Sequence, residues 1–115
     1  MPNHLSQRIT FLRALAEQGL FEANLDKLTS ECSHLSQDGP HVLVFYILRH
    51  VFEDIARALD GFPVEAGRYE ELNTIVGTEV RSVLLELERG GNVGTAELER
   101  LVRASMLGLS LFNDR

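Results

Sequence analysis

The chain has 115 residues, of which 44% are apolar and 24% charged, a composition typical of one globular domain and unlike that of disordered chains. Its formal net charge of −6 argues against nucleic acids and anionic membranes as partners, because affinity for phosphates depends on clustered Lys and Arg. Cys32 is the only cysteine, which excludes an intrachain disulfide and favours a reducing, cytoplasmic location.

Apolar residues with helical spacing predict a first helix over about residues 5–18 and a second over about 21–35. Gly19 lies between them and suits the left-handed conformation that ends many helices. The apolar phase drifts only modestly across Gly19, so a single helix kinked there is an alternative. The first twenty residues lack the apolar segment and cleavage site of a secretory signal, so export is not expected. Cys32 occupies an apolar stripe position, which predicts a buried, unreactive thiol with a raised pKa.

The third predicted helix, residues 40–60, is the most apolar element. Its longest apolar run, Val42 to Leu48, is far shorter than the ~20 residues needed to cross a bilayer, so no membrane span is predicted. On its polar face, Glu53 lies four residues from both Arg49 and Arg57 and can pair with either. At 100° per residue the apolar side chains cover about half the circumference, enough to contact two or three other helices. This apolar arc comprises Val44, Phe45, Ile47, Leu48, Val51, Phe52, Ile55, Ala56 and Leu59.

Two further helices complete the predicted fold. Gly61 and Pro63 end the third helix, and a fourth follows over about residues 64–89. The last helix begins near Thr95, a residue suited to an N-cap, and runs almost to the C-terminus. The predicted buried stripe of the fourth helix is Tyr69, Leu72, Val76, Val80, Val83 and Leu87, and that of the last is Leu98, Leu101, Val102, Met106, Leu109 and Phe112.

Helices joined by short turns marked by Gly and Pro are expected to lie antiparallel as neighbours. The sequence therefore predicts an all-α fold, an up-and-down bundle of four to five helices that forms a single domain over residues 1–115.

A second apolar strip on the last helix, Ala104, Leu107 and Leu111 with the small Gly108 beside it, lies away from the predicted main stripe. Contiguous apolar surface left exposed by a monomer commonly marks an interface. The strip therefore predicts a homodimer or a helical protein partner at this surface. The alternative is that Leu107 and Leu111 cover the first two helices of the same chain.

His50 is the principal candidate for chemistry, because it lies mid-helix on the polar face with Tyr46 and Asp54 each one turn away. A neighbouring carboxylate can engage one ring nitrogen and leave the other free as a base, ligand or phosphoryl acceptor. Histidine kinases and phosphotransfer domains also present a histidine in the middle of a bundle helix. However, Val51 stands where kinases commonly have an acid, and the Gly and Lys typical of phosphotransfer modules do not follow. The ordinary alternative is a solvated histidine on a salt-bridged face.

A carboxylate-bridged metal centre would require paired Glu-x-x-His motifs on two helices. The chain offers one candidate, His50 with Glu53, in reversed order and without a second copy, so neither a metal nor a cofactor is predicted. The leading hypothesis is a non-enzymatic helical protein–protein interaction or regulatory module that associates with itself. The competing hypothesis is histidine phosphotransfer or metal-dependent activity centred on His50 with Asp54 and Glu53.

Overall fold

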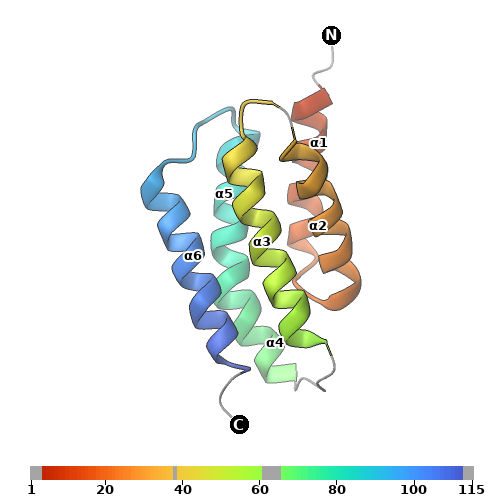
Figure 1. Ribbon diagram of the computed structural model, residues 1–115, viewed down its shortest axis with the longest axis vertical. Coiled ribbons are helices and arrows are strands. Elements are labelled where there is room, and N and C mark those ends of the chain that lie inside the picture. The colour runs from red at the N-terminus through yellow and green to blue at the C-terminus, as the bar shows by residue number, and fades with distance from the viewer. Residues whose placement is uncertain (1–3, 38, 61–65, 113–115) are drawn as a thin grey trace.

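The computed structural model describes residues 4–37, 39–60 and 66–112, and every element in these ranges is a helix (Figure 1). Three of the elements, α4, η1 and α5, follow one another without a break and form one rod with a π-helical turn inside it. The predicted all-α fold is therefore confirmed, with five helical rods. The elements are α1 (His4–Glu17), α2 (Glu22–Leu35), α3 (Val42–Leu59), α4 (Ala66–Leu72), η1 (Asn73–Gly77), α5 (Thr78–Glu88) and α6 (Thr95–Ser110). Gly61, Pro63 and the predicted start of the fourth helix near Val64 lie outside the described residues.

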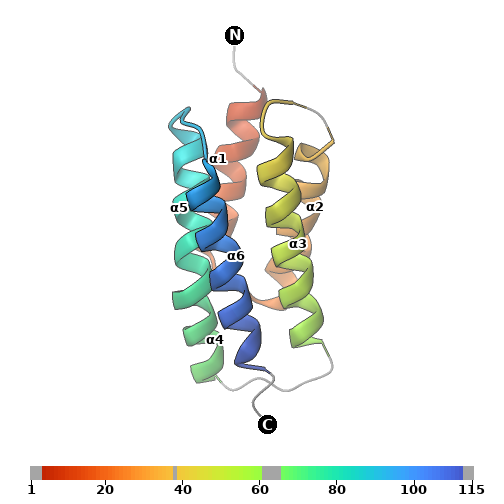
Figure 2. The same cartoon turned by 60° about the vertical axis from the view of Figure 1, so that its left-hand side comes forward.

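Successive rods run in opposite directions, so the predicted up-and-down topology is confirmed (Figure 1). Around the bundle the order is α1, α2, α3, α6 and α5, and α5 packs back against α1. Figure 2 shows α6 lying between α5 and α3. Because α3 and α6 run in the same direction, they are parallel neighbours, which sets the geometry of the surface between them. Within the described helices, none combines the length and apolar character needed to span a bilayer.

The core is built around α3, whose predicted apolar arc faces the other helices. Phe45, Leu48, Phe52 and Ile55 are almost completely buried, and Ile47 and Ala56 at the edges of the arc are partly buried. Burial of α3 on several sides requires such a wide apolar arc. Cys32 of α2 is also fully buried, and burial raises the pKa of its thiol, as predicted.

The turn between α1 and α2 is fixed by two asparagines. Asn24 is buried in α2, and its Nδ2 donates to the carbonyl oxygens of Leu15 and Gly19, both at 2.7 Å. Asn73 of η1 accepts the backbone N–H of Leu20 at its Oδ1, also at 2.7 Å. Gly19 has a φ of 111°, the left-handed conformation predicted for it. The structure thus has two separate helices here, and the kinked single helix is wrong.

The orientation of α6 differs in part from the sequence prediction. Val102 and Met106 were expected to face the core but are exposed, whereas Ala104 and Gly108, assigned to the outer strip, are buried. Small side chains let α6 approach the α4–η1 rod closely: a Cβ atom at Gly108 would lie 2.6 Å from Cγ2 of Val76. Ala104 and Gly108 therefore face the interior, because only small residues allow α6 to lie this close to the α4–η1 rod. Ala104 and Gly108 are not available as surface residues of an interface.

The start of α6 is also shifted by one residue from the prediction. Thr95 was expected to be the N-cap, but Gly94 occupies that position and Thr95 is the first helical residue. The reason is that the carboxylate of Glu97 accepts the backbone N–H of Gly94 at 2.9 Å, which satisfies a donor at the helix end.

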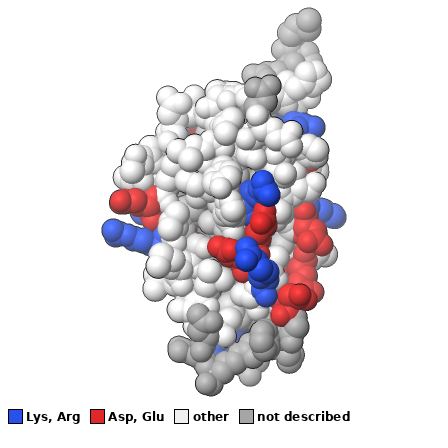
Figure 3. Space-filling view, in the orientation of Figure 1, with Lys and Arg blue, Asp and Glu red and all other residues white. Residues whose placement is uncertain are grey.

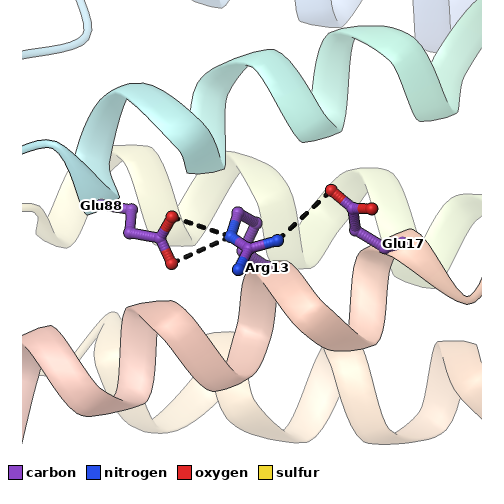
Figure 4. A network of polar contacts seen from close by, with 3 residues as sticks. All are labelled: Arg13, Glu17 and Glu88. Carbon is purple, nitrogen blue, oxygen red and sulfur yellow. Dashed lines mark hydrogen bonds and ion pairs between the residues drawn. The ribbon is translucent and has the colours of Figure 1, made fainter.

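An ion pair joins α1 to its neighbour α5 (Figure 4). Nε of Arg13 donates to both carboxylate oxygens of Glu88, at 2.8 and 2.9 Å, and Nη1 contacts Glu17 at 3.3 Å. The hydrogen bond from Arg13 holds the pKa of Glu88 below its usual range, assisted by the Thr10 hydroxyl. At a pH above the ordinary pKa of glutamate, the charged Glu88 therefore stabilises the fold. This stabilisation is lost as the pH falls through the lowered pKa of Glu88 in the folded chain.

Replacing Glu88 by glutamine is expected to lower the urea midpoint of unfolding at neutral pH, because the charge partner of Arg13 is removed. The difference from the wild type should shrink on acidification, as the native Glu88 itself becomes protonated. Glu17→Gln is the matched control and should have a smaller effect, because Glu17 is the more exposed and more distant partner. The measurement is urea unfolding followed by circular dichroism over a pH series. If the urea midpoints of the wild type and Glu88→Gln differed by the same amount throughout the acidic range, the lowered pKa of Glu88 would be contradicted.

Candidate functional site

A groove of about 310 Å³ runs between the parallel helices α3 and α6. Each helix contributes side chains spaced three and four residues apart along the edge that meets the other helix. Most of these side chains are apolar. Residues Tyr46, Ile47, His50, Val51 and Asp54 of α3 and Val102, Ser105, Met106 and Leu109 of α6 line the groove.

Large apolar side chains stand exposed on both sides of this groove. On the α3 side, Leu43 and Tyr46 are 62% and 49% exposed, and on the α6 side, Val102 and Met106 are 41% and 67% exposed. Leu43 lies one turn before Tyr46 and Ile47, so it continues the α3 edge of the groove. We call these four residues together with the groove the α3–α6 surface. The remaining rods pack on the inner side of α3 and α6, and no described helix covers the outer side.

Charge is sparse on the α3–α6 surface. Figure 3 shows uncharged surface between the charged side chains over α3 and those at the edge of α6. Asp54 is the single acidic residue among those that line the groove, and its Oδ1 accepts a hydrogen bond from Nη2 of Arg57 at 2.8 Å. The groove is therefore apolar and close to neutral, although the chain carries a net charge of −6.

A second hollow, of about 450 Å³, lies between α2 and α3. Acidic and other polar side chains dominate its lining, with Arg57 as the basic member. Such a lining is well solvated and gains little by burying an apolar partner. Its residues are Glu22, Asp26, Thr29, Glu53, Ala56, Arg57 and Asp60.

The three residues proposed for chemistry lie on one helix but do not converge. The exposed imidazole of His50 contacts the ring of Tyr46, edge to face, with 4.5 Å between ring centroids. Asp54 is paired with Arg57, and Glu53 accepts from Nε of Arg49 at 2.6 Å. The predicted Arg49–Glu53 pair is confirmed, but the predicted Glu53–Arg57 pair is wrong, because Arg57 reaches back three residues to Asp54.

This arrangement sets what the site can do chemically. A carboxylate partner would orient the imidazole for general-base chemistry, but both nearby carboxylates are engaged by arginines instead. Within the described ranges, no group of three His, Cys, Asp or Glu side chains is placed to hold a metal ion. Histidine-centred activity stays a prediction from the sequence.

The other residues of the predicted outer strip lie on the opposite flank of α6. Leu107 is 61% exposed and Leu111 is partly buried, and Nη1 of Arg68 donates to the carbonyl oxygen of Leu111. The alternative in which Leu107 and Leu111 cover the first two helices is wrong for Leu107, which lies in solvent because α6 packs between α3 and α5.

The sequence reasoning missed the exposed positions Leu43, Val102 and Met106. A signal that could have found the last two is the set of small residues Ala104, Ser105 and Gly108, which share one face of α6 and permit close packing there.

Comparison with known proteins gives no further guide to this surface: no protein-family model, curated protein or solved structure matches the chain.

Proposed function

We propose that the chain is a non-enzymatic helical interaction module that binds a helix of a protein partner through its α3–α6 surface. The observation that carries the proposal is the exposure of Leu43, Tyr46, Val102 and Met106 beside an apolar, nearly neutral groove. Apolar side chains gathered in this way are characteristic of protein interaction sites.

The energetics favour a partner helix as the ligand. Burying one large apolar side chain from water contributes roughly 1.5–3 kcal/mol, so docking on several exposed side chains supplies a useful driving force. Met106 adapts to irregular surfaces because its side chain is unbranched and flexible. Tyr46 adds a large aromatic contact with a polar tip, a combination common at interface centres.

The shape of the surface also fits a helix. Two parallel helices with a groove between them can accept side chains of a third helix at positions i, i+3, i+4 and i+7. The single buried cysteine keeps the cytoplasm as the proposed location, because a free thiol persists in a reducing compartment.

Replacing Met106 by glutamate is expected to weaken partner binding at least tenfold, because docking must then desolvate a carboxylate in an apolar contact. Met106 is 67% exposed, so the fold should be retained. The measurements are sedimentation velocity over a concentration series and retention of native-cell proteins on the immobilised chain. Phe11→Glu is the matched control, because Phe11 is an exposed apolar residue of α1, at 52%, outside the α3–α6 surface.

Retention or self-association lost with Met106→Glu and kept with Phe11→Glu would support the proposal. Equal loss with both variants would show general stickiness of exposed apolar residues, and unchanged binding with Met106→Glu would show that another surface binds. Either outcome would overturn the proposal, as would a wild-type chain that binds neither itself nor any protein.

A further inference from the structure

We infer that the occupant of the α3–α6 surface is a second copy of this chain, docked about a two-fold axis with the two α6 helices antiparallel. This inference rests on the proposed function, because it assigns the partner of the same surface. The observation behind it is a pair of opposite charges, Glu99 and Arg103, beside the exposed apolar residues of α6.

Glu99 and Arg103 are one turn apart and both exposed. Neither makes an ion pair within the part of the chain that the structure describes, a state that they share with other exposed charges such as Arg8 and Lys27. The two side chains therefore remain available for contacts between molecules.

A two-fold axis makes such a pair self-complementary. In an antiparallel contact between identical helices, each residue i faces a residue j of the partner, and j faces i in return. An acid and a base one turn apart can then form two equivalent ion pairs around the axis. The axis would pass near Val102, which is partly exposed at the same level of α6.

The apolar residues support the same contact. At 100° per residue, Val102, Met106, Glu99 and Arg103 fall within an arc of about 100° on α6. Around this arc the order is Val102, Met106, Glu99 and Arg103, so the two apolar residues lie on the side of the groove and the two charges on the far side. A helix docked in the groove would therefore contact the apolar pair and have the charges at its outer margin, where interfaces usually carry polar groups.

Net charge disfavours the acidic surfaces of the chain for self-association. The chain carries −6, so docking through an acidic surface, such as the one that holds Glu22 and Asp26, brings like charges together. On the α3–α6 surface, Asp54 is paired with Arg57, and beside this surface the charge of Glu99 is balanced by Arg103.

The test is a charge exchange measured by sedimentation equilibrium. Glu99→Arg and Arg103→Glu each turn both intermolecular attractions into repulsions, so each variant alone should dimerise about tenfold more weakly than the wild type. An equimolar mixture of the two variants should form a heterodimer with both pairs restored. The double variant E99R/R103E should form a homodimer like the wild type. Circular dichroism of each variant checks that the fold is retained, as expected for exposed positions.

Two outcomes would overturn the inference while leaving the proposed function in place. One is a wild-type dimer that Met106→Glu dissociates but that neither the charge variants nor their mixture affects, which would place the two-fold contact elsewhere on the surface. The other is a monomer at millimolar concentration that retains a different protein through Met106. If Met106→Glu leaves every association unchanged, the proposed function itself fails.

Discussion

Replacing Asn24 by aspartate is expected to lower the free energy of unfolding by about 3–5 kcal/mol at neutral pH, the cost of an uncompensated buried charge. The substitution changes almost no volume, but it exchanges an amide donor for a carboxylate that can only accept. In the native chain, Nδ2 of Asn24 donates to the carbonyl oxygens of Leu15 and Gly19 at 2.7 Å. The variant places a negative oxygen against both carbonyls in a buried position.

The penalty should depend on pH in a defined direction. Burial and the two carbonyl dipoles raise the pKa of the introduced carboxyl in the folded chain above its unfolded value. A group with a raised folded pKa is least destabilising while it is protonated, and its penalty grows as the pH rises through its titration. The difference in unfolding free energy between variant and wild type should therefore increase from acidic to neutral pH.

Asn73→Asp is the matched control for this prediction. Oδ1 of Asn73 accepts the N–H of Leu20, a role that a carboxylate keeps, so the variant loses only the bond from Nδ2 to the carbonyl oxygen of Tyr69. Its cost should be about 1 kcal/mol. Urea unfolding of the three chains over a pH series measures both effects. An Asn24→Asp chain as stable as Asn73→Asp at neutral pH would show that the two carbonyls find other donors.

Much of the fold followed from local patterns in the sequence. The apolar arc of α3 was predicted residue by residue, because one helix packed against several others must bury half of its circumference. Gly19 was predicted at a helix end, and it adopts a positive φ. Apolar arcs and helix ends depend on residues that are close in the sequence, so they can be predicted from the sequence alone.

The orientation of α6 could not be predicted in the same way. Apolar residues occur on two flanks of this helix, and hydrophobicity alone favours Val102 and Met106 over Ala104 and Gly108 for the interior. The choice was decided by close approach to η1, a tertiary contact that the sequence signals only through the small residues on one face of the helix. The π-helical turn at Asn73–Gly77 was missed for a similar reason, since it accompanies the packing of η1 against α6 and the bond from Asn73 to the α1–α2 turn.

The candidate site was predicted only in part. The expectation of an apolar interface on α6 stays a prediction, but its residues change: Leu107 is exposed, Ala104 and Gly108 are buried, and an apolar groove lies beside Val102 and Met106. Ion-pair partners on a helix were also ambiguous, because residues three and four apart are both neighbours. Arg57 illustrates this, since it pairs with Asp54 and not with Glu53.

The position of the α3–α6 surface depends on the interior of the bundle. Gly108 brings α6 against the α4–η1 rod, and this rotation of the helix turns Val102 and Met106 toward the groove and solvent. A change at Gly108 should therefore affect the fold and the proposed interface together, whereas Met106→Glu should affect the interface alone.

Replacing Gly108 by leucine is expected to lower the free energy of unfolding by about 3 kcal/mol, the upper end of typical costs for overpacking a core. A Cβ atom at this position would lie 2.6 Å from Cγ2 of Val76 and 3.0 Å from Cδ1 of Leu72, and both neighbours are fully buried. Val76 is β-branched and has little rotamer freedom in a helical turn, so it cannot move aside cheaply. The gain of about 1 kcal/mol in helix propensity on losing a glycine opposes this cost but is smaller.

The smaller change Gly108→Ala should cost about 1 kcal/mol, because strain at Val76 exceeds the gain in propensity. Gly67→Ala is the matched control: nothing lies within 4 Å of its Cβ position in α4, so the same change should leave stability equal or slightly higher. In a Val76→Ala background, where the methyl group that would clash is removed, Gly108→Ala should become stabilising. A double-mutant cycle by urea unfolding measures this coupling. If Gly108→Ala stabilised the native chain as much as Gly67→Ala, close approach would not be what fixes α6, and the outward placement of Val102 and Met106 would need another cause.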